Sequence, residues 1–465
     1  MLRGYRFPGM DLTSEQRRNL RAWCVYDWAT NGYQVTTASA LLPVFFVQGI
    51  APEGAVLLGT HVPPTALWGF AIGLAALVVV MMSPLLGAVA DFTSLRKEFL
   101  TVFACGGSLC ASLLFFSSEG TVWFTLLFFV LAHICYTSGN VFYDSFLPQI
   151  VPEEWTDRAS GRGFAYGYVG GGLQFALALG LLTFHEPIGI SQELALRIGL
   201  LTAGLWWIGF ALYTFLNLKD APPAVRFEKT ASGLRLAVVA GAGRTWRTVK
   251  RLPKFPALLL FLVAFLLYND GIQTVIGISA AYGGSELELT PQTIMLTFLV
   301  VQFIAFGGAL AFSRLAGKIG AKRAILLALA VWTGAVFYAY FLPAGNRWGF
   351  FLLGAVVGLV LGGSQALSRS LFASMIPISA AAGFFGFYSV FNKLSAISGP
   401  LLFATLTTLF GSARPAILAL GAYFVIGGIL LSLVNVEKAR ASRALWQIDA
   451  ADPEPEPKAP DGGKE

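Results

Sequence analysis

Charged side chains are scarce in this sequence. Asp, Glu, Lys and Arg together make up 12% of its 465 residues, whereas 56% are hydrophobic. A chain of this composition has too little polar surface to cover a water-soluble body of its size. The scarcity therefore excludes an ordinary soluble domain and predicts a membrane protein.

Cysteine and histidine are also few, with four and three residues. Cys24, Cys105, Cys110 and Cys135 all fall in apolar segments, so we interpret them as small buried hydrophobic side chains rather than as disulfides or metal ligands. The sequence also lacks Gly-x-Ser-x-Gly, His-Glu-x-x-His and Walker motifs. We therefore expect no enzyme activity, no metal and no cofactor.

Long apolar runs, in contrast, are abundant. Scanning for runs of roughly 18 to 25 residues finds about twelve candidate spans. They cover residues 22–48, 66–90, 98–117, 121–147, 161–184, 194–218, 256–282, 292–315, 323–342, 348–372, 383–409 and 413–435. No small-residue cleavage site follows the first run, so we interpret it as a retained span.

The positive charges fall almost entirely on one side of these spans. They occupy the N-terminal tail, alternate loops, the segment between spans six and seven, and the C-terminal tail, and only Arg197, Arg347 and Arg414 fall on the other side. Because Lys and Arg are retained in the cytoplasm, we expect both termini to be cytoplasmic and the protein to lie in a bacterial inner membrane. This placement accounts for the net charge of +7 without nucleic acid as a partner.

One sequence motif occurs twice in the chain. The residues Asn140, Asp144, Ser145 and Pro152 recur in register as Gln365, Arg369, Ser370 and Pro377. Such a repeat in apolar segments is typical of transporters built from two related halves. We expect a cytoplasmic N-terminal tail (1–21), a six-helix bundle (22–218), a partly amphipathic cytoplasmic linker (219–255), a second six-helix bundle (256–435) and a disordered cytoplasmic tail (436–465).

Polar residues at helical spacing mark spans one, four, seven and ten. Ionisable groups are costly inside a membrane, so each one is a candidate for function. Matching polar faces on equivalent spans predict a shared central cavity for a small-molecule substrate. The candidates, with one lysine from span eleven, are Asp27, Asn31, Gln34, His133, Asn140, Asp144, Asn269, Asp270, Gln273, Gln365, Arg369 and Lys393.

Two buried ion pairs are suggested by these positions. Asp270 and Lys393 lie at similar depth in the second half, and a pair between them could couple proton binding to movement or simply fix the packing of spans seven and eleven. Asp144 and Arg369 occupy equivalent positions with opposite charge. They could meet across the halves as a gate, bind the charged ends of a substrate, or cap their own helices separately.

The turn after span two carries a second candidate gate. Gly87 and Asp91 are followed by Arg96 and Lys97. An aspartate at this place can contact cations and a neighbouring helix N-terminus, and so hold the halves together in one state. In span eleven, Gly399-Pro400 predicts a kink.

The order of these features resembles the major facilitator superfamily. Within it, the chain is similar to the branch named for the yeast vacuolar amino-acid effluxer linked to autophagy. The residues that carry the resemblance are Tyr26-Asp27-Trp28-Ala29, Asn31, Tyr33, the stretch 140–148, Tyr268, Asp270-Gly271, the stretches 365–370 and 384–388, and Gly399-Pro400.

This resemblance implies a rocker-switch transporter with a central site, and amino acids are the best-attested cargo of the branch. The chain departs from the superfamily early in span four, where it has no basic residue, so a proton-antiport mechanism is not carried over. We expect a monomeric all-α membrane protein of the major facilitator fold that exports an amino acid or related metabolite, with protons as a candidate coupling ion. Alternatives are an exporter of cationic drugs, a non-transporting sensor and a lipid scramblase.

Overall fold

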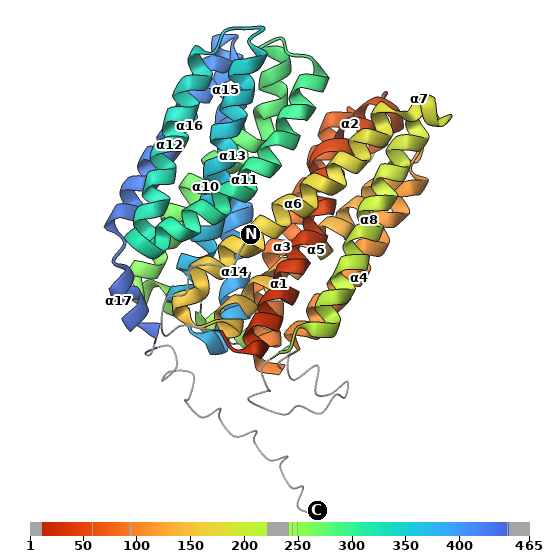
Figure 1. Ribbon diagram of the computed structural model, residues 1–465. Coiled ribbons are helices and arrows are strands. Elements are labelled where there is room, and N and C mark those ends of the chain that lie inside the picture. Colours follow the sequence, from red (N-terminus) through yellow and green to blue (C-terminus); the bar gives the residue numbers. More distant parts are fainter. Residues whose placement is uncertain are drawn as a thin grey trace, which may run out of the picture.

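Two helical bundles lie side by side in the computed structural model, one for each half of the chain (Figure 1). The structure describes residues 12–57, 59–93, 95–220, 241–243, 245–248, 250–443 and 445. We call the end of the molecule where α1 begins and α17 lies the terminal face. The bundles come together at this face and diverge towards the end that carries α2, α7 and α15 (Figure 1).

The first bundle contains the helices and the hairpin up to residue 217. In order they are α1 (Ser14–Gly32), a π-helical segment (Tyr33–Leu41), α2 (Leu42–Phe45), a second π-helical segment (Phe46–Ile50), β1 (Ala55–Leu57), β2 (Thr60–Val62), α3 (Pro64–Thr93), α4 (Arg96–Leu113), α5 (Val122–Ile150), α6 (Thr156–Thr183), α7 (His185–Ile188) and α8 (Gln192–Asn217). The two strands pair antiparallel, with Ala55 opposite Val62.

The second bundle begins at residue 256. Its helices are α10 (Pro256–Ser285), α11 (Pro291–Ile319), α12 (Ala321–Phe341), α13 (Arg347–Met375), α14 (Ala381–Leu394), α15 (Ser398–Phe410), α16 (Ala413–Leu433) and α17 (Val436–Ala441). Short 3-10 turns occur at Leu114–Phe116, Glu153–Trp155, Leu252–Lys254 and Ile378–Ala380.

The helix lengths match a membrane-spanning fold. Eleven helical segments of the described residues are long and apolar enough to cross a membrane. The continuous α- and π-helical stretch from Ser14 to Ile50 supplies one more crossing of the same length class. The predicted all-α membrane protein with about twelve spans is therefore confirmed.

The ends of the bundles differ from the sequence prediction. Helix α1 begins at Ser14, eight residues before the expected start at 22, because Thr13 and Gln16 form a reciprocal capping box. The tail expected to be disordered from 436 instead continues into α17, and Arg443 Nη2 lies 3.0 Å from Glu153 Oε2 of the first bundle. The predictions for most of the linker and for residues 446–465 lie outside the described residues.

Span eleven is broken, as its Gly-Pro pair predicts. Helix α14 ends at Leu394 and α15 starts at Ser398, so the break precedes the pair instead of centring on it. Pro400 therefore falls in the first turn of α15, where a helix needs no backbone N–H donor. The expected kink is a complete interruption of the helix.

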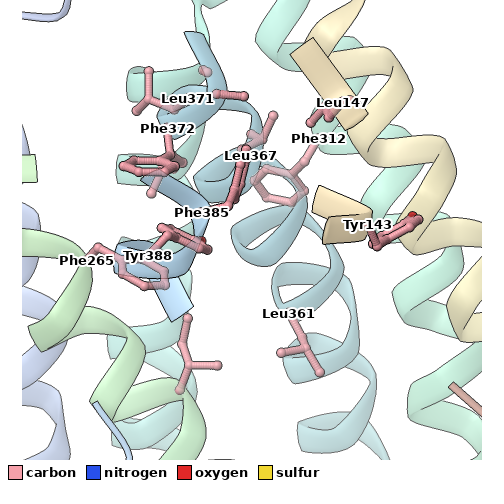
Figure 2. Packing of buried hydrophobic residues seen from close by; sticks show 14 of the residues in the cluster. Tyr143, Leu147, Phe265, Phe312, Leu361, Leu367, Leu371, Phe372, Phe385 and Tyr388 are labelled. Carbon is pink, nitrogen blue, oxygen red and sulfur yellow. The ribbon is translucent and has the colours of Figure 1, made fainter. Parts of the chain in front are cut away.

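Aromatic side chains fill the core near the terminal face (Figure 2). Phe265 of α10 stacks on Tyr388 of α14 with 4.4 Å between ring centroids, and Phe372 of α13 stacks on the same tyrosine at 4.8 Å. Tyr143 and Leu147 approach this cluster from the first bundle (Figure 2). The two stacking contacts join α10, α13 and α14 within the second bundle. Of the four cysteines, however, only Cys24 is buried and Cys105 is exposed, which corrects the expectation for Cys105.

An acidic cap stabilises α16 at the face opposite the terminal face. Glu286 accepts hydrogen bonds from Ser412 Oγ (2.9 Å), the Ala413 backbone N–H (3.0 Å) and Arg414 Nε (3.1 Å). Burial raises the pKa of the Glu286 carboxyl, but the hydrogen bonds from Ala413, Ser412 and Arg414 outweigh it, so the pKa lies below its usual value.

Glu286→Gln should therefore lower stability in a pH-dependent way. Because the folded-state pKa is depressed, the contribution of the carboxylate is fully present above the unfolded pKa and is lost as pH falls through the folded pKa. We expect the variant to be about 1 kcal/mol less stable at pH 7. The difference in melting temperature, measured in detergent from pH 7 to 3, should shrink below about pH 4.5. A difference that is constant over this range would contradict the prediction.

Candidate functional site

A polar cavity lies between the two bundles. Its volume is about 480 Å³, and α1, α5 and α6 of the first bundle and α10, α11, α13 and α14 of the second contribute to its walls. The predicted residues that line it are Asp27, Asn31, Gln34, His133, Asn140, Asp144, Asn269, Gln273, Gln365, Arg369 and Lys393. Equivalent spans of the two halves thus bring their polar faces to one place, as their spacing predicts.

Asp270 is the exception, because it does not line the cavity. Its carboxylate instead accepts hydrogen bonds from Ser398 Oγ and from the Gly399 backbone N–H, the latter at 2.9 Å. It therefore caps the first turn of α15 after the break in span eleven. Successive residues of a helix are turned by about 100°, so Asn269 and Gln273 share the cavity face while Asp270 points to a different neighbour.

The predicted pair between Asp270 and Lys393 is consequently wrong. Among the described residues, no carboxylate oxygen lies within 4.0 Å of Lys393 Nζ; its polar neighbour is His133 Nε2 at 3.4 Å. The lysine thus reaches across to α5 of the first bundle. Asp270 and Lys393 were expected at similar depth, but their side chains do not face each other.

The predicted pair between Asp144 and Arg369 is confirmed. Arg369 Nη1 donates to Asp144 Oδ1 at 2.9 Å, and the bond joins α5 to α13 across the two bundles. The same nitrogen lies 3.7 Å from Asp27 Oδ2. Arg369 is only 3% exposed, so one guanidinium is enclosed between two carboxylates in a region shielded from water.

Further contacts saturate this arginine. Its Nε donates to Ser160 Oγ (3.0 Å) and its Nη2 donates to the Ser160 backbone carbonyl (3.1 Å). The guanidinium carbon lies 4.1 Å from the ring centroid of Phe164 and 4.7 Å from that of Trp23. An arginine surrounded by carboxylates, a serine and aromatic faces is bound to the protein on every side.

Asp27 is held in the same network from α1. Its Oδ2 accepts a hydrogen bond from Tyr143 at 2.9 Å and its Oδ1 accepts one from Asn31 at 3.2 Å. Helix α1 can lie this close to α6 because of glycine: a Cβ on Gly167 would lie 2.4 Å from Asn31 Nδ2. The close packing of α1 on α6 thus places Asp27 and Asn31 at the cavity.

Further hydrogen bonds connect α6 and α13 near Arg369, and several of the residues that form them were not predicted from the sequence. Ser160 donates to the Ala366 carbonyl (2.7 Å), Ser370 donates to Asp157 (2.6 Å), and Tyr168 donates to Gln365 (2.5 Å). Each bond joins α6 to α13. Asp157 and Ser160 lie three residues apart at the start of α6, so their shared helix face was a signal available in the sequence.

The contacts predicted for Asp91 in the turn after span two are also formed. Asp91 accepts hydrogen bonds from the backbone N–H groups of Ala382 (3.0 Å) and Gly383 (2.7 Å) at the start of α14, and lies 2.7 Å from Arg96 Nη2. This carboxylate therefore caps a helix of the other bundle, as expected. Arg96 is also 3.8 Å from Asp220.

Gly87 and Lys97 contribute to the contacts of this turn through their backbones. A Cβ on Gly87 would lie 2.2 Å from the Ala382 carbonyl oxygen, so only glycine allows α3 and α14 to approach this closely. Lys97 donates its backbone N–H to Asp220 at 3.3 Å, whereas the sequence interpretation assigned it to the gate as a cation. The terminal side of the cavity is therefore closed by two layers of contacts between the bundles.

Comparisons with known proteins agree with this architecture. A family model for vacuole effluxer Atg22-like proteins matches residues 15–444. The MFS-type transporter YxiO of Bacillus subtilis strain 168, itself uncharacterized, is 31% identical over 418 residues, which cover 90% of this chain and 94% of YxiO. Autophagy-related protein 22-1 of Penicillium rubens is 22% identical over 551 residues, which cover 93% of this chain and 92% of the relative.

A solved structure extends the agreement to the fold. The major facilitator superfamily proton:xylose symporter XylE matches 92% of this chain and 99% of its own with a TM-score of 0.67 at 12% identity. At that identity the match concerns the fold alone. The chain therefore belongs to the vacuole effluxer Atg22-like family, and it is a multi-pass membrane transporter with the major facilitator fold.

Proposed function

We propose that this chain is a secondary transporter that exports a small zwitterionic metabolite, such as an amino acid, across a bacterial cytoplasmic membrane by alternating access. The observation that carries the proposal is the cavity of about 480 Å³ between the bundles, with breakable polar contacts between the bundles on its terminal side. Contacts that can open and re-form on the two sides in turn are what alternating access requires.

The charges of the cavity favour a zwitterion as cargo. Among its described lining residues, Asp27 and Asp144 balance Arg369 and Lys393. The side chain of Asp144 is 19% exposed, against 4% for its partner Arg369, so this carboxylate remains accessible to an ammonium group. A cation with no acidic group would leave Lys393 unbalanced, and this argues against cationic drugs as the cargo.

The orientation is part of the proposal. Lys and Arg concentrate on the terminal face, so we place that face in the cytoplasm. The structure would then correspond to a state closed towards the cytoplasm. The word effluxer in the family description supports export as the direction.

Transport in sealed vesicles tests this function. The purified full chain would be reconstituted in proteoliposomes, and counterflow of the twenty radiolabelled L-amino acids would be compared with that of a cationic dye. We expect saturable counterflow of one or more amino acids and none of the dye. Repeating the assay with an imposed pH gradient asks whether protons are the coupling ion.

The outcomes separate the alternatives. Exchange of labelled lipid between leaflets without amino-acid counterflow would indicate a scramblase. Counterflow of the dye alone would indicate a drug exporter. A protein that moves no solute would contradict the proposed function.

A further inference from the structure

We propose that Lys393 and Asn392 of α14, positioned by His133 of α5, form the anion subsite of the cavity and bind the carboxylate of the cargo. This inference rests on the proposed function, since it names the part of the cavity that recognises one end of a zwitterion. It assigns the carboxylate to Lys393 rather than to Arg369, although both cations line the same cavity.

The protein leaves these two cations in different states. Arg369 has two carboxylates within 4 Å, two hydrogen bonds to Ser160 and aromatic rings on its faces. Lys393 has no carboxylate oxygen within 4.0 Å among the described residues, and its polar neighbour is the His133 ring nitrogen at 3.4 Å. An ammonium group at membrane depth is costly without a counter-charge. A carboxylate entering the cavity supplies that counter-charge at Lys393.

The side-chain amide of the neighbouring Asn392 can also donate hydrogen bonds to the carboxylate of the cargo. Asn392 Oδ1 accepts hydrogen bonds from Asn269 Nδ2 (2.9 Å) and Gln273 Nε2 (3.3 Å). With its oxygen held by two donors from α10, the amide offers its NH₂ group as the remaining polar end, and Asn392 lines the cavity. Lys393 and Asn392 thus present only donors.

His133 acts on the lysine rather than on the cargo. Its Nε2 faces the ammonium group and can accept a hydrogen bond from it only if the proton of the ring is on Nδ1. Nδ1 is buried without a hydrogen-bond partner in the structure. We therefore assign His133 as a positioning residue that holds Lys393 across the interface between the bundles.

The donor set also indicates the class of anion. One ammonium group and one amide match the single charge and two oxygens of a carboxylate. A phosphate would bring up to two negative charges, and Arg369, the other cation of the lining, is already occupied by Asp144 and Asp27. The subsite therefore suits an amino acid better than a phosphorylated metabolite.

Binding measurements on acids and their amides test the subsite. The purified full chain in nanodiscs would be titrated with the twenty L-amino acids, and the tightest binder would then be compared with its primary amide, which keeps the ammonium but lacks the carboxylate. We expect the amide to bind wild type at least tenfold more weakly, or about 1.4 kcal/mol. Lys393→Met should weaken binding of the acid by a similar factor and leave the amide unchanged.

A matched variant controls for loss of a lysine as such. Lys219→Met removes an exposed lysine that pairs with Glu15 at 3.0 Å outside the cavity, and it should leave both affinities unchanged. His133→Phe should weaken binding of the acid less than Lys393→Met does, because the histidine variant keeps the lysine and only releases it from its position.

The possible failures are distinguishable. If the acid and its amide bind wild type equally, or if Lys393→Met binds the acid as tightly as wild type, the subsite is overturned while the proposed function stands. If no amino acid binds wild type, both are overturned. Should Lys393→Met fail to fold, the wild-type comparison of acid with amide and the variant Lys393→Gln decide the question.

Discussion

Replacing Arg369 by methionine should abolish transport. Removal of one partner from a buried ion pair costs about 3–5 kcal/mol because the other charge is left unpaired. Here two carboxylates, Asp144 at 2.9 Å and Asp27 at 3.7 Å, lose their cation together. The state closed at the terminal face should therefore lose stability relative to the state open there. Because about 1.4 kcal/mol corresponds to a tenfold change, the population ratio of the closed to the open state should fall by a factor of at least about 100.

Two measurements check this expectation. The first is the initial rate of amino-acid counterflow in proteoliposomes. The second is the distance between spin labels at Glu98 and Lys318, which are exposed near the terminal ends of α4 and α11. In Arg369→Met the distance should lengthen as the bundles separate at the terminal face.

Arg414 provides the matched control. It is a partly buried arginine paired with Glu286 at 3.1 Å, but both residues belong to the second bundle. Arg414→Met should lower the melting temperature and leave counterflow per folded molecule close to wild type. If Arg369→Met transports normally, or if both variants lose transport equally, the arginine is not a gate between the bundles.

Replacing Gly87 by valine should block the same closure by a different route. The Cβ of the new side chain would lie 2.2 Å from the Ala382 carbonyl oxygen, a backbone atom that no rotamer change can move. Overpacking of this kind typically costs about 1–3 kcal/mol. We expect counterflow below about a tenth of the wild-type rate and a longer distance between the labels at the terminal face.

Gly73→Val is the control within the same helix. A Cβ on Gly73 meets no atom within 4 Å, so this substitution makes the same change in helical propensity without the clash. Its transport should match wild type. Equal loss in the two variants would show that valine harms α3 itself, and the close approach to α14 would then not be the cause.

Arg369 and Gly87 belong to two layers of contacts that close the terminal side of the cavity. Arg369 joins α13 to α5 and α1 within the membrane, whereas Gly87 and Asp91 join α3 to the start of α14 near the terminal face. The C-terminal helix adds an outer contact, in which Arg443 and Arg440 lie 3.0 and 3.5 Å from Glu153. Each contact joins the two bundles, so rotation of one bundle against the other must break all of them.

Much of the site could be predicted because helical periodicity is a local property. Asp27, Asn31 and Gln34 share a face of the first span however that span packs, and the duplicated motif placed Asp144 and Arg369 at equivalent positions. A carboxylate and a guanidinium that are costly to bury separately must then find a counter-charge. Composition and spacing therefore determined the membrane fold, the two halves and the charged residues of the cavity wall.

Tertiary structure alone decided which partner each polar group received. Asp270 and Lys393 have complementary charge and similar depth, yet one caps α15 and the other reaches His133 of the opposite bundle, because the rotation of each helix is set by packing with its neighbours. Ser160 and Tyr168 became part of the closure only through the position of α6 against α13. Depth and spacing are properties of one helix, whereas a contact depends on the relative placement of two.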